Sequence, residues 1–135
     1  MPQGSVLGPI LFTLFINDLS QHVYLGSVNL YADDTLVYCS GRTVSDVNEL
    51  LQKCIDDVSL WYDGNRLLLN TSKSNTMVVG SRHQLQNMDD DLEIILNDEL
   101  LECVSKCDYL GSRIDQNLSC NDHVNKLCIS LSLKL

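Results

Sequence analysis

Two adjacent aspartates, Asp33 and Asp34, are the residues of this chain whose type and spacing most directly suggest chemistry. They lie between two short runs that favour β-structure, 28–32 and 35–39, so the sequence predicts a β-hairpin with both acids at its tip. Neighbouring carboxylates repel each other unless a cation neutralises them, and Mg²⁺ prefers oxygen ligands of this kind. A solvated turn is the alternative interpretation, because aspartate is common in turns. Spacing alone leaves both open.

A second set of candidate ligands lies in the last third of the chain. Cys103 and Cys107 form one close pair, and Cys120 and His123 form another. Sulfur and imidazole at such separations suit tetrahedral zinc. Cysteine is also among the most buried residue types. No basic segment precedes the first apolar run, so the sequence does not predict a secretory signal. We therefore expect reduced thiols, as in an intracellular protein, and most of them in the core.

The elements that must position these residues include two predicted helices. Apolar residues cover nearly the whole circumference of 10–19, which predicts a helix buried on most sides. The clearest helix is 43–62, where apolar residues recur at helical spacing. Thr43 with Asp46 resembles a capping pair at its start.

Strands and turns are predicted after the second helix. The expected strands are 67–69, 76–79, 92–96, 100–104 and 109–114, of which 92–96 and 100–104 form a hairpin. The polar stretch 81–91 favours a loop, and helical spacing from Ser119 predicts a final helix. We therefore expect an α+β fold: one antiparallel sheet with helices packed on one face.

The composition is that of a globular domain with an acidic balance. The chain has 135 residues, 44% of them hydrophobic, and a formal net charge of −9. Because phosphate backbones bind basic surfaces, the chain should bind nucleic acid poorly by itself. No apolar run reaches the length of a membrane span, so we expect no membrane contact. Because the sequence shows no secretory signal, we expect an intracellular protein, with the nucleus as one candidate location.

The twin acids belong to a series of motifs that resembles a known family. The segment 31–34, Tyr-Ala-Asp-Asp, is similar to the metal-binding box of reverse transcriptases. The segments 2–9 and 15–19 resemble the motif that precedes this box in non-LTR (LINE-type) retrotransposon enzymes. The positions that match the family's next motif are Trp61, Asn65, Leu67, Asn70 and Lys73. Those that match the primer-grip region are Tyr109, Leu110, Gly111, Asp115 and His123.

The resemblance implies an RNA-directed DNA polymerase. It implies a palm domain with a palm-like antiparallel sheet over 1–135, running into the start of the thumb and lacking the fingers. Asp33 as the direct ligand and Asp34 as the accessory ligand would hold two Mg²⁺ ions for nucleotidyl transfer. One ion would activate the primer 3′-hydroxyl and the other would stabilise the leaving pyrophosphate. An RNA template and a DNA primer would be the partners of the complete enzyme.

The resemblance also assigns roles to other matched positions. Gln3 and Gly4 would lie against template and incoming nucleotide, Gly4 because a residue without Cβ lets the backbone approach closely. Tyr31 would pack beneath the primer end, and 109–111 would form the primer grip. Lys73 would act as a general acid toward the departing pyrophosphate. By residue type alone, a surface lysine in a turn is an equally good interpretation of Lys73.

The sequence departs from the family's pattern near its ends. The family's palm needs a further aspartate on a strand upstream of the segment 2–9, whereas this sequence begins at Met1, within that motif. A two-metal site that lacks a ligand loses its clamp on the reacting oxygens, so we expect the chain to be inactive alone. Cys120 replaces a frequent aromatic residue, and we interpret His123 as structural. The alternatives are a non-catalytic relic, an interaction fragment that exposes apolar surface, and a zinc-binding module.

Overall fold

The structure is a computed structural model that describes residues 7–88, 92–119 and 123–124. These residues form an α+β fold, in agreement with the sequence prediction. The helices are α1 (Gly8–Ile16), α2 (Leu19–His22), α3 (Val44–Gly64) and α4 (Arg82–Gln86), with a 3₁₀ turn η1 (Thr71–Lys73). The strands are β1 (Ser27–Tyr31), β2 (Asp34–Tyr38), β3 (Asn75–Thr76), β4 (Ile95–Leu96), β5 (Glu99–Leu100), β6 (Glu102–Cys103), β7 (Lys106–Tyr109) and β8 (Ser112–Asp115).

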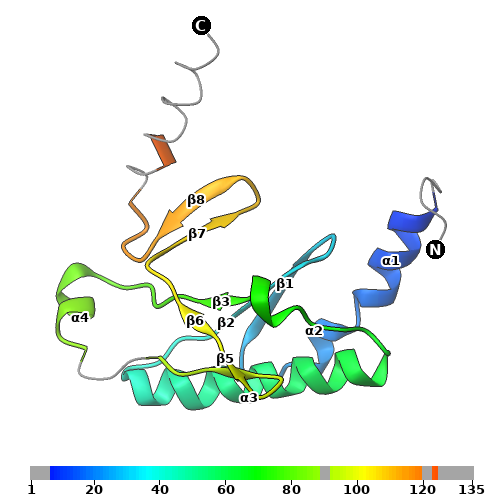
Figure 1. Cartoon of the computed structure of the whole chain (residues 1–135), viewed down its shortest axis with the longest axis horizontal. Coiled ribbons are helices and arrows are strands. Elements are labelled where there is room, and N and C mark those ends of the chain that lie inside the picture. Colours follow the sequence, from blue (N-terminus) through cyan, green and yellow to red (C-terminus); the bar gives the residue numbers. More distant parts are fainter. Residues whose placement is uncertain (1–6, 89–91, 120–122, 125–135) are drawn as a thin grey trace, which may run out of the picture.

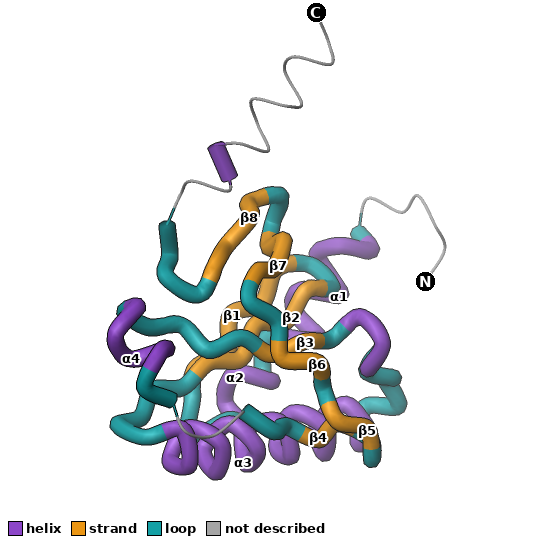
Figure 2. The backbone as a smooth tube through the Cα atoms, turned by 60° about the vertical axis from the view of Figure 1, so that its left-hand side comes forward, coloured by secondary structure: helices purple, strands orange, loops and turns teal. Residues whose placement is uncertain are grey.

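The long helix α3 is the base on which the other elements lie. In Figures 1 and 2 it runs along one side of the molecule, with the β1–β2 hairpin above it and the β7–β8 hairpin farthest away. The helix begins at a capping box, in which the Thr43 hydroxyl accepts from the Asp46 N–H and the Asp46 carboxylate accepts from the Thr43 N–H. The predicted helix at 43–62 and its predicted cap are therefore confirmed.

Two apolar clusters pack against α3. The first contains the buried residues Ile16, Leu19, Val23, Cys54, Val58, Trp61 and Tyr62. The second contains Leu92, Ile94, Leu96 and Leu101, packed against the partly buried Val47, Leu51, Ile55, Leu69 and Val78. Because α3 contributes to both clusters, it connects the hairpin that carries the acids to the β4–β5 region.

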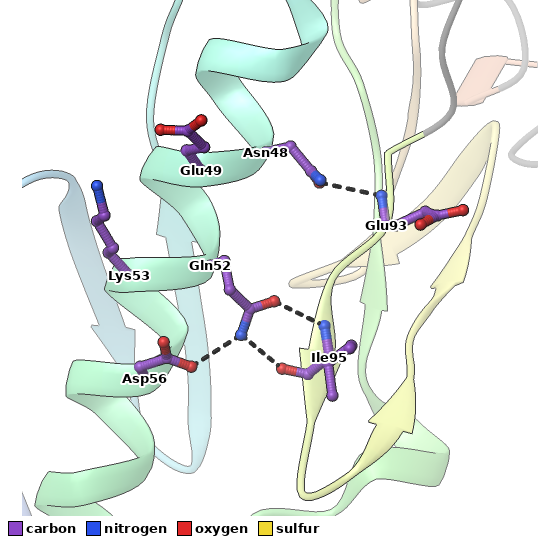
Figure 3. A pocket seen from close by; sticks show the side chains of 7 residues that line it. All are labelled: Asn48, Glu49, Gln52, Lys53, Asp56, Glu93 and Ile95. Atoms are coloured by element: carbon purple, nitrogen blue, oxygen red, sulfur yellow. Dashed lines mark hydrogen bonds between the residues drawn. The ribbon is translucent and has the colours of Figure 1, made fainter.

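The strands of the described residues form four two-stranded sheets instead of the one antiparallel sheet that we expected. Three of them are antiparallel, and β3 pairs with β6 in parallel. A side chain of α3 accounts for one of the separations. The Gln52 amide donates to the carbonyl oxygen of Ile95 and accepts from its N–H, as a neighbouring strand would (Figure 3). The backbone of β4 is thus satisfied without a third strand.

The first helix is exposed, although its composition predicted burial on most sides. Leu7, Ile10, Leu11, Leu14 and Phe15 are all exposed, Leu14 by 69%. In Figure 1 α1 rises away from the end of α3. Within this helix only Ile16 is buried in the first cluster, and Phe12 is partly buried against it. The prediction was wrong because the described residues supply no second surface to cover this helix.

Several strand predictions need correction. The segment 67–69 is irregular, and the expected strand at 76–79 is only the two-residue β3. The single strand expected at 109–114 is interrupted by a turn at Leu110 and Gly111, whose φ angles are +48° and +80°. Two central residues with positive φ form the kind of tight turn that joins antiparallel strands, so this region is the β7–β8 hairpin.

The remaining predictions concern the stretch from 81 onward. The expected loop at 81–91 contains α4, which starts at a capping box between Ser81 and Gln84. The hairpin expected from 92–96 and 100–104 is confirmed around Asn97 and Asp98, where β4 pairs with β5, but it is shorter than predicted. Residues 92–94 are not strand, and Glu102–Cys103 pairs with β3 in another sheet. Of the final helix predicted from Ser119, the structure describes Ser119, which is not helical, and residues 123–124, which are; the rest lies outside the described residues. No helix of the described residues is long and apolar enough to span a membrane.

Candidate active site

The predicted acid-bearing hairpin is confirmed. Strands β1 and β2 pair in antiparallel register from Ser27 with Tyr38 to Tyr31 with Asp34. Ala32 and Asp33 form the connecting turn, so one acid lies in the turn and the other begins β2. Both acids are exposed. Their carboxylates are therefore accessible to a ligand from solvent.

The two faces of this hairpin differ in composition. Residues alternate between faces along a strand. Val28, Leu30 and Val37 are partly buried and pack against the first apolar cluster. Tyr31 and Asp34 are exposed and directly paired, so their side chains lie beside each other on the outer face. This arrangement places an aromatic ring next to one of the acids.

The two hairpin acids could supply part of the ligand set of a Mg²⁺ ion. Mg²⁺ is usually held by one or two protein carboxylates, with water and phosphate oxygens as the other ligands. Two adjacent, exposed carboxylates match that requirement, and open solvent around them leaves room for the other ligands. Within residues 7–88, 92–119 and 123–124 there is no group of three or more histidine, cysteine, aspartate or glutamate side chains that could hold a metal ion.

The other predicted site residues lie on separate elements. Lys73 ends the 3₁₀ turn η1 and is exposed, which is compatible with both interpretations of this lysine. Tyr109 ends β7 and is partly buried, and Leu110 and Gly111 form the exposed turn that follows. This hairpin belongs to a different sheet from the acid-bearing hairpin. Gln3 and Gly4 lie outside the described residues.

The loop after β8 is organised by Asp115. Its carboxylate accepts hydrogen bonds from the Asn117 N–H at 2.9 Å, the Ser119 N–H at 3.1 Å and the Ser119 hydroxyl at 2.7 Å. These bonds, that from the Ser119 hydroxyl first, lower the pKa of Asp115. The Arg113 N–H donates to Nδ1 of His123 at 3.3 Å, which agrees with a structural role for this histidine.

The cysteines of the described residues are free thiols in different surroundings. Cys54 is fully buried and Cys39 is partly buried, and burial raises the pKa of both. Cys103 is exposed and Cys107 is partly buried, so among the described cysteines only Cys54 is fully buried and the expectation that most lie in the core is not met. Cys120 lies outside the described residues, and among the described ones Cys103, Cys107 and His123 form no metal-binding group.

A hollow between α3 and β4 lies apart from the predicted site. It is lined by Asn48, Glu49, Gln52, Lys53, Asp56, Glu93 and Ile95 (Figure 3). None of the candidate site residues is among these seven. Two of the lining side chains serve the fold, because Gln52 bonds to the backbone of Ile95 and Asn48 accepts from the Glu93 N–H.

A contact that the sequence did not predict lies beneath the acids. The hydroxyls of Thr35 and Tyr62 are 3.1 Å apart and form a partly buried hydrogen bond between β2 and α3. The only signal in the sequence is that Thr35 is a hydroxyl residue on a strand face that otherwise carries valine and leucine.

Comparison with known proteins identifies the family. The model of the family described as reverse transcriptase (RNA-dependent DNA polymerase) matches residues 1–114. The RNA-directed DNA polymerase from mobile element jockey of Drosophila melanogaster is 26% identical over 134 residues, which are 94% of this chain and 14% of that protein. The probable RNA-directed DNA polymerase from transposon X-element of the same species is 27% identical over 143 residues, 100% of this chain and 15% of that protein.

A third relative comes from a different insect. The retrovirus-related Pol polyprotein from type-1 retrotransposable element R1 2 of Nasonia vitripennis is 22% identical over 134 residues, 97% of this chain and 33% of that protein. No solved structure matches the chain. The chain thus spans from 14% to 33% of the length of these three relatives. Because the family model covers most of the chain, the chain belongs to the reverse transcriptase family, and its relatives are polymerases of non-LTR retrotransposons.

Proposed function

We propose that this chain is the part of an RNA-directed DNA polymerase palm that binds magnesium, running into the start of the thumb over residues 1–135. The observation that carries the proposal is the pair of adjacent, exposed carboxylates of Asp33 and Asp34 at the tip of β1–β2. Membership of the reverse transcriptase family supports it. In this proposal the short sheets of the chain are parts of a palm-like sheet.

The proposed reaction is template-directed nucleotidyl transfer. Bound Mg²⁺ supplies activation of the primer 3′-hydroxyl and neutralises charge on the leaving pyrophosphate. The chain itself contributes two carboxylates that would bind the metal, that of Asp33 as the direct ligand and that of Asp34 as the accessory ligand. Tyr31, beside Asp34 on the outer face, packs beneath the primer end. Lys73 donates a proton to the departing pyrophosphate.

The partners and the remaining roles belong to the same proposal. Gln3 and Gly4 contact template and incoming nucleotide, and Tyr109, Leu110 and Gly111 contact the primer. The RNA template and the DNA primer bind the complete polypeptide, which acts inside the cell, with the nucleus as one site. The chain alone, with a net charge of −9, binds them weakly. We expect no extension of a primed RNA template by the isolated chain; Asp33-dependent incorporation of nucleotides would contradict this.

Metal affinity tests the proposal without requiring polymerase activity. Mn²⁺ serves as a paramagnetic probe for the Mg²⁺ site, and its binding is followed by electron paramagnetic resonance. We expect Asp33→Asn to weaken Mn²⁺ binding about tenfold or more, and Asp34→Asn to weaken it less. Asp98→Asn is a matched control, since Asp98 is an exposed acid in the two-residue turn of another hairpin.

The comparison between the two hairpins decides the outcome. If Asp98→Asn leaves the Mn²⁺ affinity unchanged while Asp33→Asn reduces it, the metal binds at the predicted site. If all three substitutions have the same small effect, the ion only responds to the overall negative charge of the chain. That result would remove the basis of the proposed function.

A further inference from the structure

The acid-bearing hairpin is attached to α3 near both ends of the helix. At the base of the hairpin, the Cys39 thiol lies 3.7 Å from the carbonyl oxygen of Val47, in the first turn of α3. At its tip, the Thr35 hydroxyl lies 3.1 Å from the Tyr62 hydroxyl, in the last turn of α3. Strand β2 therefore runs along α3, and its acid-bearing end is fixed beside Tyr62.

Thr35 and Tyr62 are polar residues in apolar surroundings. The inner face of the hairpin otherwise consists of Val28, Leu30 and Val37, which pack against the first cluster. Tyr62 is 8% exposed and is a member of that cluster. A hydroxyl that leaves water without a new partner destabilises the fold. The two hydroxyls satisfy each other in one placement of the hairpin on α3, so this contact specifies a position that apolar packing alone would leave less defined.

The position of Tyr62 is fixed by contacts of its ring and of its backbone. It meets the Trp61 ring edge-on, with 5.4 Å between ring centroids, and Trp61 lies 5.8 Å from the Phe15 ring of α1. The carbonyl oxygen of Tyr62 accepts from the Leu67 N–H at 2.9 Å, at the start of the segment that leads to Lys73. Tyr62 therefore contacts the hairpin through Thr35 and the segment that leads to Lys73 through Leu67, and it is linked to α1 through Trp61.

Thr35 can transmit this position to the acids because it follows Asp34 directly. Successive side chains of a strand point to opposite faces, so Thr35 points to the core while Asp34 points to solvent. The turn between the strands contains Ala32 with φ +52°, a conformation that residues with a side chain rarely adopt. Such a turn persists only when its surroundings hold it in place. Fixing β2 at Thr35 supplies that support next to the turn.

We propose that Tyr62 is a positioning residue, which holds Asp33 and Asp34 in one orientation through its hydrogen bond to Thr35. The inference rests on the proposed function, since the orientation of the acids matters only if they bind a cation together. Tyr62 itself touches neither metal nor substrate. Its role extends the site from the hairpin to the end of α3.

Four substitutions separate this role from general packing. Tyr62→Phe removes the hydroxyl and keeps the ring, and Thr35→Val removes the other hydroxyl at nearly the same size. Thr35→Ser retains a hydroxyl and should preserve the hydrogen bond to Tyr62. Tyr24→Phe is the control, because Tyr24 is 83% exposed and its hydroxyl lies outside the core. Each variant is compared with wild type by amide hydrogen exchange, by Mn²⁺ affinity and by urea denaturation.

We expect faster exchange at residues 32–35 and weaker Mn²⁺ binding, each by about fivefold, in Tyr62→Phe and in Thr35→Val. The β7–β8 hairpin, in a separate sheet, is the internal reference and should exchange at the wild-type rate. Thr35→Ser and Tyr24→Phe should resemble wild type. The double variant Tyr62→Phe with Thr35→Val should be no worse than either single variant, because both remove the same interaction.

Two negative results have different meanings. If wild type binds Mn²⁺ through Asp33 but Tyr62→Phe changes only the denaturation midpoint, Tyr62 is merely structural and the positioning role is overturned, while the proposed function stands. If Mn²⁺ binding by wild type does not depend on Asp33, the proposed function fails, and the positioning role fails with it.

Discussion

Asp115 shows, at the scale of single residues, how this chain uses a carboxylate for structure. Its side chain is buried, and it accepts hydrogen bonds from Asn117 and from both the N–H and the hydroxyl of Ser119. Asp33 and Asp34, in contrast, are exposed at the tip of a hairpin. A carboxylate that is satisfied within the fold has little capacity for a ligand. The two exposed acids retain theirs.

The pH dependence of stability should reveal the structural role of Asp115. Its folded-state pKa lies below the ordinary value of 3.8, so the ionised form contributes stability that is present above that value and is lost as the pH falls through the lowered pKa. We expect Asp115→Asn to be less stable than wild type at pH 7, and the difference to shrink under strongly acidic conditions. Urea denaturation at several pH values measures this. A loss of stability that is independent of pH would contradict it.

The site could be predicted from the sequence only where its signals are local. The hairpin with Asp33 and Asp34 at its tip was predictable, because two β-favouring runs flank an acidic pair. The contact between Thr35 and Tyr62 was not, since the two residues are 27 positions apart and each has an ordinary local interpretation. Pairing of this kind depends on how β2 lies on α3. No periodic pattern encodes that arrangement.

At the scale of elements, α3 joins the parts of the molecule through polar side chains as well as apolar ones. Asn48 and Gln52 bond to the backbone at Glu93 and Ile95, and Gln52 also donates to Asp56 (Figure 3). These bonds replace those of a neighbouring strand. The isolated two-residue strands of β4 and β5 therefore depend on a helix for their support.

Gln52→Glu tests this dependence. The substitution removes the amide donor to the Ile95 carbonyl and places a negative charge beside Asp56. We expect it to destabilise the chain by about 1–2 kcal/mol at pH 7 in urea denaturation. Part of the loss should be recovered below about pH 4, where a carboxylic acid can donate. Gln86→Glu, at the exposed end of α4, makes the same change of charge and should have little effect.

The elements differ in how much of them the sequence reveals. The helix α3 was predictable because its periodicity is long and its cap is local. The break in 109–114 was missed because Leu110, with a φ angle of +48°, is an unusual residue for a position that favours glycine or asparagine. Helix α4 was missed because it is short and polar, although Ser81 and Gln84 give the capping signal. The turn at Leu110 was missed because its residue type does not match its conformation, and α4 was missed because its periodicity is weak.

At the scale of the whole molecule, we expect the exposed apolar helix α1 to determine whether the chain self-associates in solution. Exposed apolar patches of this kind favour association. We expect the chain to self-associate as its concentration rises, and Leu14→Glu to reduce this in sedimentation velocity. Leu68→Glu is the control, because Leu68 is 95% exposed but lies outside α1. A chain that stays monomeric at all concentrations, or an equal effect of both substitutions, would contradict the role of α1.

The fold class was predictable from the order of elements, whereas the division of the sheet was not. Short β-favouring runs indicate strands, but they do not determine which strands become neighbours. In this chain Gln52 occupies the edge of β4, and β3 pairs with β6 over only two residues on each side. Burial of α1 could not be predicted either, since it depends on what else covers that helix.

The central claim is that the twin acids of the β1–β2 hairpin bind a divalent cation, and a Mg²⁺ titration followed by amide NMR tests it most directly. The account predicts saturable shifts at Ala32, Asp33 and Asp34, and saturation only at about tenfold or more higher Mg²⁺ concentration in the Asp33→Asn variant. Shifts that instead concentrate along the acidic hollow of Glu49, Asp56 and Glu93 would contradict it, because the ion would then bind where the fold offers no hairpin acids.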